Sequence, residues 1–205
     1  MVTRNFDIFI SGGGVAGLTA AAAFGSAGFS VLVVDPTPPV TTKTANGADL
    51  RTTAFLQPAK AFLERAGLWD ALAPHATALQ IMQIVDASGS DGSIRTKAAF
   101  NAADISDAPF GWNLPNWLLR REMISRLNAL DKVTLETGVG FADMVARTRY
   151  ALVRLTDGSQ VHCKLVIGAD GRHSQVRNAA GITAKTTHYG QKALTFSVTH
   201  SQPHN

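Results

Sequence analysis

The chain has 205 residues, of which 45% are hydrophobic and 17% are charged, and its formal net charge is +4. These values are typical of folded chains with one or two compact units, and they exclude the disordered and fibrous classes. Lysine and arginine are scattered and form no basic stripe with interleaved aromatic residues, so we do not expect nucleic-acid binding.

The N-terminal region reads as a strand, a glycine-rich turn, a helix and a second strand. The apolar run 6–10 is followed by glycines, then by a predicted helix over 18–27 and a predicted strand over 29–35. Parallel strands need a crossover of this kind, so the region predicts a βαβ unit. The prolines that follow, in the segment 36–47, predict an exposed connection.

Further helices and strands follow. Apolar residues at near-helical spacing predict a helix over 51–72 with a stop at Gly67, and another helix is expected over 115–130. Between them, the alternation over 79–100 predicts an antiparallel hairpin around a turn at Ser88 to Gly92.

The last third of the chain predicts a β-meander. Strand-like runs cover 133–136, 138–147, 150–156 and 160–167, and the Asp157-Gly158 pair is a strong hairpin signal. After the loop that begins at Gly168, we expect a short helix to Ala180 and a final strand from Ala193 to Thr199.

The glycine-rich turn carries a motif with a physical meaning. Gly12, Gly14 and Gly17 form a G-x-G-x-x-G set between a strand and a helix, a context that indicates dinucleotide binding. The glycines let the backbone approach a pyrophosphate, whose charge lies at the positive end of the helix. Asp35, at the end of the second strand, is placed to accept hydrogen bonds from a ribose. The alternative is a loop used only for tight packing, and the motif alone does not separate FAD from NAD.

Two further segments resemble a known family. Residues 49–54 (DLRTTA) and 168–177 (GADGRHSQVR) are similar to the D-x-R-x-x-A segment and the G-A-D-G-x-x-S-x-x-R fingerprint of the p-hydroxybenzoate hydroxylase superfamily of flavoproteins. Within it, residues 48–72 and 116–127 most resemble the UbiH/UbiF-type hydroxylases of ubiquinone biosynthesis. The resemblance covers nearly the whole chain. It implies an α/β fold: a Rossmann-like FAD/NAD(P)-binding domain with a β-meander, plus part of a second, mixed-sheet substrate domain.

The resemblance also implies the residues that would contact the cofactor. The glycine loop and Asp35 would hold the ADP half of FAD, Arg51 would reach the flavin side, and Arg120 would contact the dinucleotide. Val139 would offer backbone bonds near the adenine, and Asp170 would stand near the pyrophosphate and the ribityl chain. The implied cofactor-binding set is Gly12, Gly14, Val15, Ala16, Gly17, Asp35, Arg51, Arg120, Val139, Asp170 and Gly171. No side chain is nominated as a catalytic acid or base.

Several of these residues also have a purely structural interpretation. Asp49 and Arg51 could form a solvated pair at a helix start, where an acid is favoured. Asp170 followed by Gly171 could be an ordinary turn. Arg120 could coat an exposed helix face.

In the resembled family the flavin carries the chemistry: NAD(P)H reduces it, and one oxygen atom of O₂ is transferred to an electron-rich phenol ring. The resemblance therefore implies FAD as cofactor, NAD(P)H as co-substrate and a small aromatic substrate, here a polyprenylated phenol. The only cysteine, Cys163, fits a cytoplasmic setting. The alanine-rich run 15–27 falls short of the ~20 apolar residues of a membrane span, so contact with the inner face of the membrane or with a ubiquinone-biosynthesis complex would be peripheral.

Members of the family run to about twice this length, more than one ordinary domain, and carry a third flavin motif of the G-D-A-A-H type that this sequence lacks. We therefore expect an N-terminal fragment with little hydroxylase activity alone. We expect a discontinuous FAD-binding domain at 1–78 and 116–180, and an incomplete substrate domain at 79–115 and 181–205.

Two other functions stay open. The first is another flavoenzyme of the same superfamily, such as a halogenase or a prenyl reductase, and the second is a non-catalytic dinucleotide-binding module. The histidines show no H-E-x-x-H spacing or compact cluster, so no metal site is expected. Ser11 and Ser174 lack a G-x-S-x-G elbow, so nucleophilic hydrolysis has no support.

Overall fold

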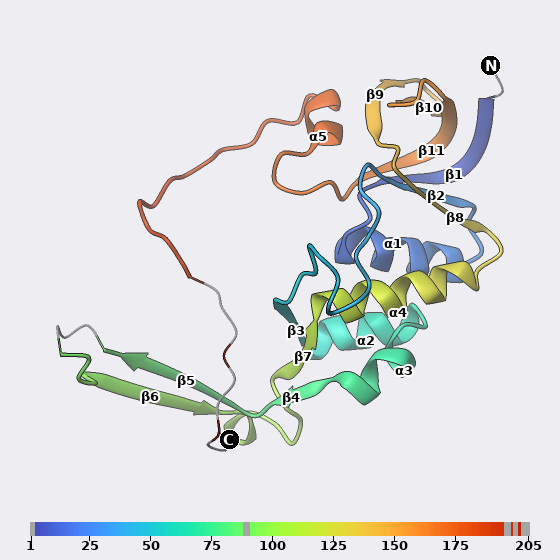
Figure 1. Cartoon of the computed structure of the whole chain (residues 1–205). Helices are drawn as coiled ribbons and strands as arrows, with labels where there is room; N and C mark the ends of the chain where they lie inside the picture. Colours follow the sequence, from blue (N-terminus) through green and yellow to red (C-terminus); the bar gives the residue numbers. More distant parts are fainter. Residues whose placement is uncertain (1–2, 88–90, 195–197, 199–200, 202–205) are drawn as a thin grey trace.

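A computed structural model of the chain describes residues 3–87, 91–194, 198 and 201. Its central sheet has the strand order β8-β2-β1-β11-β10-β9 (Figure 1). Strands β8, β2, β1 and β11 are parallel, and β10 is antiparallel to both of its neighbours, β11 and β9. The strands are β1 (Thr3–Ser11), β2 (Val31–Asp35), β8 (Val133–Thr137), β9 (Phe141–Ala146), β10 (Ala151–Leu155) and β11 (Gln160–Gly168). The expected α/β class with a parallel sheet and a meander is confirmed.

The central sheet is buried on both faces, which explains the nearly continuous apolar runs of its inner strands. Alternate residues of β1 belong to two different cores: Ile8 and Ile10 to one, and Phe9 to the other. The first core lies under the helices α1 (Val15–Ser26) and α4 (Asn116–Asn128), which pack side by side in Figure 1. The second lies under the meander and the short helix α5 (Gln175–Ala179).

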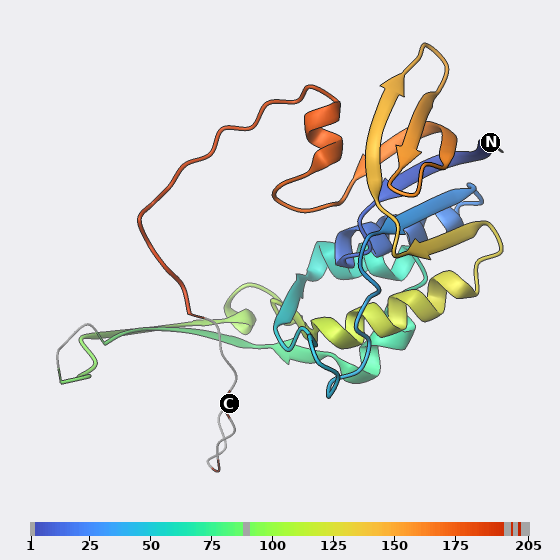
Figure 2. The ribbon, with the colours of Figure 1, turned by 45° about the horizontal axis from the view of Figure 1, so that its top comes forward.

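A smaller layer lies beyond these helices. Strands β3 (Thr52–Leu56), β7 (Gly111–Pro115) and β4 (Thr77–Leu79) form an antiparallel sheet in the order β3-β7-β4. The helices α2 (Gln57–Arg65) and α3 (Trp69–Leu72) and the short 3₁₀ turns η1 (Ala73–His75) and η2 (Ala102–Asp104) accompany it. The expected hairpin is confirmed as β5 (Ile81–Asp86) paired with β6 (Thr96–Asn101), and it projects away from the rest of the fold (Figure 2).

The predicted helix over 51–72 is wrong at its N-terminal end. Residues 52–56 form β3, which pairs with β7, and the helix α2 begins only at Gln57. Pro58 explains the difference, because a proline fits the first turn of a helix but would disrupt its interior. The stop at Gly67 is confirmed, with φ +68° just after the end of α2.

Other boundaries shift by smaller amounts. The strand expected over 138–147 begins only at Phe141, because Gly138 has φ +81° and interrupts the extended backbone. The strand expected from Ala193 to Thr199 lies mostly outside the described residues, as do residues 88–90 of the expected hairpin turn.

Candidate functional site

The turn between β1 and α1 is built from glycines that have different roles. Gly12 has φ +113°, and a Cβ placed on it would lie 2.3 Å from the carbonyl oxygen of Ala169. A Cβ on Gly17 would lie 1.9 Å from the carbonyl oxygen of Gly12. These two glycines are therefore needed for packing. Gly14 differs, because no atom lies within 4 Å of a Cβ built on it. Open space remains at the N-terminus of α1.

The cofactor-binding residues that were predicted at the start of α1 lie in this same turn. Val15 and Ala16 form the first turn of α1, and Gly14 is its N-cap without a side-chain cap. The N–H groups of a first helical turn have no partner within the helix. Together with the helix dipole, they make an anion site beside the open face of Gly14.

The Asp-Gly loop lies against the glycine turn. The N–H of Ala169 donates to the carbonyl of Ser11 at 2.8 Å, just after the paired ends of β1 and β11. Asp170 Oδ2 accepts hydrogen bonds from the backbone N–H groups of Gln175 (2.9 Å) and Val176 (3.2 Å) at the start of α5. Its other oxygen, Oδ1, is buried and has no hydrogen-bond partner among the described residues. Asp170 therefore orders a turn and also offers an acceptor to a ligand.

Both loops line one cleft of about 510 Å³. Its walls are Ser11, Gly12, Gly14, Asp35, Pro36, Gly140, Phe141, Thr156, Ala169, Asp170, His173 and Gln175. A smaller adjoining pocket of about 180 Å³ shares Gly14 and Asp35 with the cleft and adds Arg120 to its walls. The glycine turn after β1 and the Asp-Gly loop after β11 thus meet at the carboxyl ends of parallel strands, where ligands usually bind in such sheets.

Asp35 holds the glycine turn in place. Its Oδ2 accepts from the N–H of Gly13 at 2.7 Å, and its Oδ1 accepts from the N–H of Thr37 at 2.8 Å. A carboxylate has further lone pairs beyond these two bonds, so Asp35 can still accept a hydrogen bond from a ribose hydroxyl.

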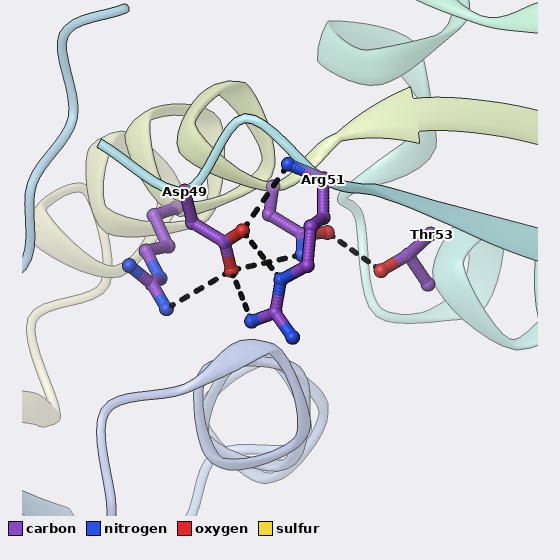
Figure 3. A network of polar contacts seen from close by, with 5 residues as sticks. Asp49, Arg51 and Thr53 are labelled. Carbon is purple, nitrogen blue, oxygen red and sulfur yellow. Dashed lines mark hydrogen bonds and ion pairs between the residues drawn. The ribbon is translucent and has the colours of Figure 1, made fainter. Parts of the chain in front are cut away.

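The two predicted cofactor-binding arginines, Arg51 and Arg120, both lie against Asp49, and Figure 3 shows this network. Arg51 donates to Asp49 through Nε and Nη2, both at 2.8 Å, while Arg120 Nη2 lies 3.8 Å from the same carboxylate. Only 12% of the Asp49 side chain is exposed, whereas 69% of the Arg51 side chain is, so the carboxylate is sheltered and the guanidinium is solvated. The hydrogen bonds from Arg51 hold the pKa of the Asp49 carboxyl well below its usual range.

The other predicted positions differ in how they relate to the cleft. Gly171 has φ +83° and gives the Asp-Gly loop its turn. Val139 does not line the cleft but a separate hollow with Arg4 and Glu136. Its neighbour Gly140 lines the cleft, and its N–H donates to Thr156 Oγ1 at 2.9 Å. Sequence reasoning missed Gly140 and Thr156, because only the pairing of the meander brings them together.

The geometry fits a dinucleotide. The start of α1 offers an anion site, Asp170 offers an unpaired acceptor, and two pockets adjoin at Gly14 and Asp35. These are features that a diphosphate between two nucleoside-like halves requires.

Comparison with known proteins identifies the family. Residues 5–204 match the FAD binding domain family. The chain belongs to this family. FAD, the cofactor that the family resemblance implies, is confirmed, and so is the resemblance to the p-hydroxybenzoate hydroxylase superfamily and its ubiquinone hydroxylases.

Three similar proteins illustrate the relationship. The ubiquinone hydroxylase UbiL of Rhodospirillum rubrum is 34% identical over 97% of this chain and 44% of its own length. The 3-demethoxyubiquinol 3-hydroxylase of Escherichia coli is 28% identical over 97% of this chain and 49% of its own length. The flavin-dependent monooxygenase PieE, solved with FAD and substrate, matches with a TM-score of 0.69 and 26% identity over 86% of this chain and 32% of its own. The chain thus spans about half the length of these curated relatives.

Within the described residues, no helix combines the length and the apolar character that crossing a membrane requires.

Proposed function

We propose that this chain supplies the FAD-binding part of a monooxygenase that hydroxylates a polyprenylated phenol in ubiquinone biosynthesis, with NAD(P)H as the reductant. One observation carries the proposal: the glycine turn and the Asp-Gly loop line a single cleft. The similarity to a ubiquinone hydroxylase and to a 3-demethoxyubiquinol 3-hydroxylase supports the proposed substrate class.

The residues around the cleft have complementary proposed roles. The open face of Gly14 and the first turn of α1 would bind the diphosphate, and Asp35 would accept from the adenosine ribose. Asp170 Oδ1 would accept a hydrogen bond from a hydroxyl of the ribityl chain, and this bond would give the buried oxygen the partner that it lacks. Bound FAD would supply the redox chemistry, while the protein would position it and exclude water.

The projecting hairpin supports the proposed division into domains. Ile84 and Phe100 are 55% and 48% exposed, and every described residue of β5 and β6 is exposed. An isolated two-stranded ribbon is marginal in water, so this one needs further structure against it. We assign 1–78 and 116–180 to the FAD-binding domain, and 79–115 and 181–205 to part of a substrate domain. Little hydroxylase activity is then expected of this chain by itself.

A polyprenylated substrate partitions into lipid. The proposal is therefore that the enzyme acts in the cytoplasm, at the inner surface of the membrane. The association would be peripheral.

Product analysis tests the proposal. A protein that contains this sequence and has the length of its relatives would be incubated with FAD, NAD(P)H, O₂ and a polyprenylated phenol. The products would be identified by mass spectrometry. A product heavier by one oxygen atom, labelled from ¹⁸O₂, is expected. A halogenated ring or a saturated prenyl chain would instead identify another flavoenzyme, and a protein that binds no flavin would identify a non-catalytic module.

A further inference from the structure

The main cleft contains little positive charge for a ligand that carries a diphosphate. Among the described residues that form its walls, the carboxylates are Asp35 and Asp170, and none is a lysine or an arginine. The adjoining pocket contributes Arg120, beside Gly14. Arg120 is thus the cationic side chain beside the proposed diphosphate position, and it meets Arg51 at the carboxylate of Asp49.

Both arginines are organised by one carboxylate. Asp49 receives two side-chain hydrogen bonds from Arg51, one from Asn116 Nδ2 at 3.0 Å, and the ion pair with Arg120 (Figure 3). The Asp49 side chain is mostly buried, whereas 69% of the Arg51 side chain is exposed. The bonds use Nε and Nη2 of Arg51 and leave Nη1 for a ligand.

The backbone around Asp49 is fastened to the start of α4. The carbonyl of Asp49 accepts from the N–H of Trp117 at 3.2 Å, and the carbonyl of Arg51 accepts from the N–H of Asn116 at 2.9 Å. Asn116 Oδ1 also accepts from Thr53 Oγ1 at 2.6 Å. Asp49 is therefore held rigidly, and a fixed carboxylate keeps two long, flexible arginine side chains close together despite their mutual repulsion.

We propose that Asp49 is a positioning residue for the cofactor: it does not contact FAD but holds Arg120 at the pocket beside Gly14 and Arg51 next to it. This inference rests on the proposed function, because it assumes that FAD occupies the cleft. It predicts that loss of the Asp49 charge weakens FAD binding. If Asp49 instead competed with FAD for the arginines, loss of its charge would strengthen binding.

The test is a titration of the purified protein with FAD, followed by quenching of flavin fluorescence. Asp49→Asn keeps the shape and removes the charge, and Asp49→Glu restores the charge on a longer side chain. Asp70→Asn, at an exposed position of α3, is the matched control for the change in net charge. Asp49→Asn is also placed in the Arg120→Ala background, because a double-mutant cycle measures whether the two residues act together.

We expect Asp49→Asn to raise the Kd for FAD by about tenfold or more, the range of one charge-assisted hydrogen bond. Asp49→Glu should recover part of this loss, Asp70→Asn should match the wild type, and the effect of Asp49→Asn should shrink in the Arg120→Ala background. If Asp49→Asn does not fold, the smaller Asp49→Ser is titrated against the same expectations.

The outcomes separate the two levels of the proposal. A wild-type protein that binds no FAD overturns the proposed function itself. A wild type that binds FAD, with Asp49→Asn binding equally or more tightly, overturns only the positioning role. A full effect of Asp49→Asn in the Arg120→Ala background also overturns it, because Asp49 would then act without that arginine.

Discussion

Replacement of Gly14 by alanine should separate cofactor binding from folding. Gly14 has φ −76° and ψ 177°, which any residue adopts, and apart from its chain neighbours no atom of the described residues lies within 4 Å of a Cβ built there. The added methyl group therefore meets nothing within the protein. It would occupy the space in front of the first turn of α1, where we propose that the diphosphate approaches the backbone.

Two opposing effects set the change in the free energy of unfolding. Alanine is a poorer N-cap than glycine by up to about 1 kcal/mol, but it reduces the entropy of the unfolded chain and so returns about 0.4–1 kcal/mol. The net change should lie within about 1 kcal/mol. Loss of one charge-assisted hydrogen bond to the diphosphate costs about 1.5–3 kcal/mol, which corresponds to a rise in the Kd for FAD of about 10- to 100-fold.

Gly12→Ala provides the contrast. Its Cβ would lie 2.3 Å from the carbonyl oxygen of Ala169 at φ +113°, so it should destabilise the fold by at least ~1–3 kcal/mol. Urea denaturation measures the stability of each variant, and fluorescence titration measures FAD affinity. A folded Gly14→Ala protein that binds FAD like the wild type would refute the reasoning, as would a loss of stability equal to that of Gly12→Ala.

Other substitutions and conditions test separate parts of the structure. Asp35→Asn should weaken FAD binding by about tenfold in the same titration, because an amide is a poorer acceptor than a carboxylate; unchanged affinity would argue against a ribose contact. Met123→Ala should lower the free energy of unfolding in urea by about 2–5 kcal/mol, because Met123 is fully buried in the helix-side core; a loss below about 1 kcal/mol would contradict this packing. Burial raises the pKa of the Cys163 thiol to about 11, so at pH ~8 a disulfide reagent should react far more slowly with folded than with urea-unfolded protein; equal rates would show that the thiol is accessible. Because Arg51 holds the pKa of Asp49 below its ordinary value, the stability from this charge is present above pH ~4 and lost as pH falls below it. The difference in unfolding free energy between the wild type and Asp49→Asn should therefore shrink in acid, and a constant difference would contradict the assignment.

The β1–α1–β2 unit could be predicted from local patterns because each element carries its own signal. An apolar run, glycines at fixed spacing and a second apolar run that ends in Asp35 lie within a short stretch, so the observed elements differ from the predicted ones only near their ends. The helix predicted over 51–72 is wrong at its start because near-helical apolar spacing continues into β3, whereas Pro58 marks the first turn of α2.

Contacts between distant residues were harder to predict. The Asp49 network joins residues 67 positions apart, from Asp49 to Asn116, and no local pattern encodes such a pairing. The cleft wall at Gly140 depends on the register between the strands of the meander, whereas Val139, which the family resemblance implies, lines a separate hollow. Motifs thus indicated the chemistry of the site, while the packing of separate strands determined which neighbours complete it.

A crystal structure of the protein soaked or grown with FAD tests the central claim most directly. We expect the diphosphate against Gly14 and the first turn of α1, with Asp170 on the opposite wall of the same cleft. Density for FAD at any other surface, with the cleft between the glycine turn and the Asp-Gly loop filled only by solvent, would contradict the account.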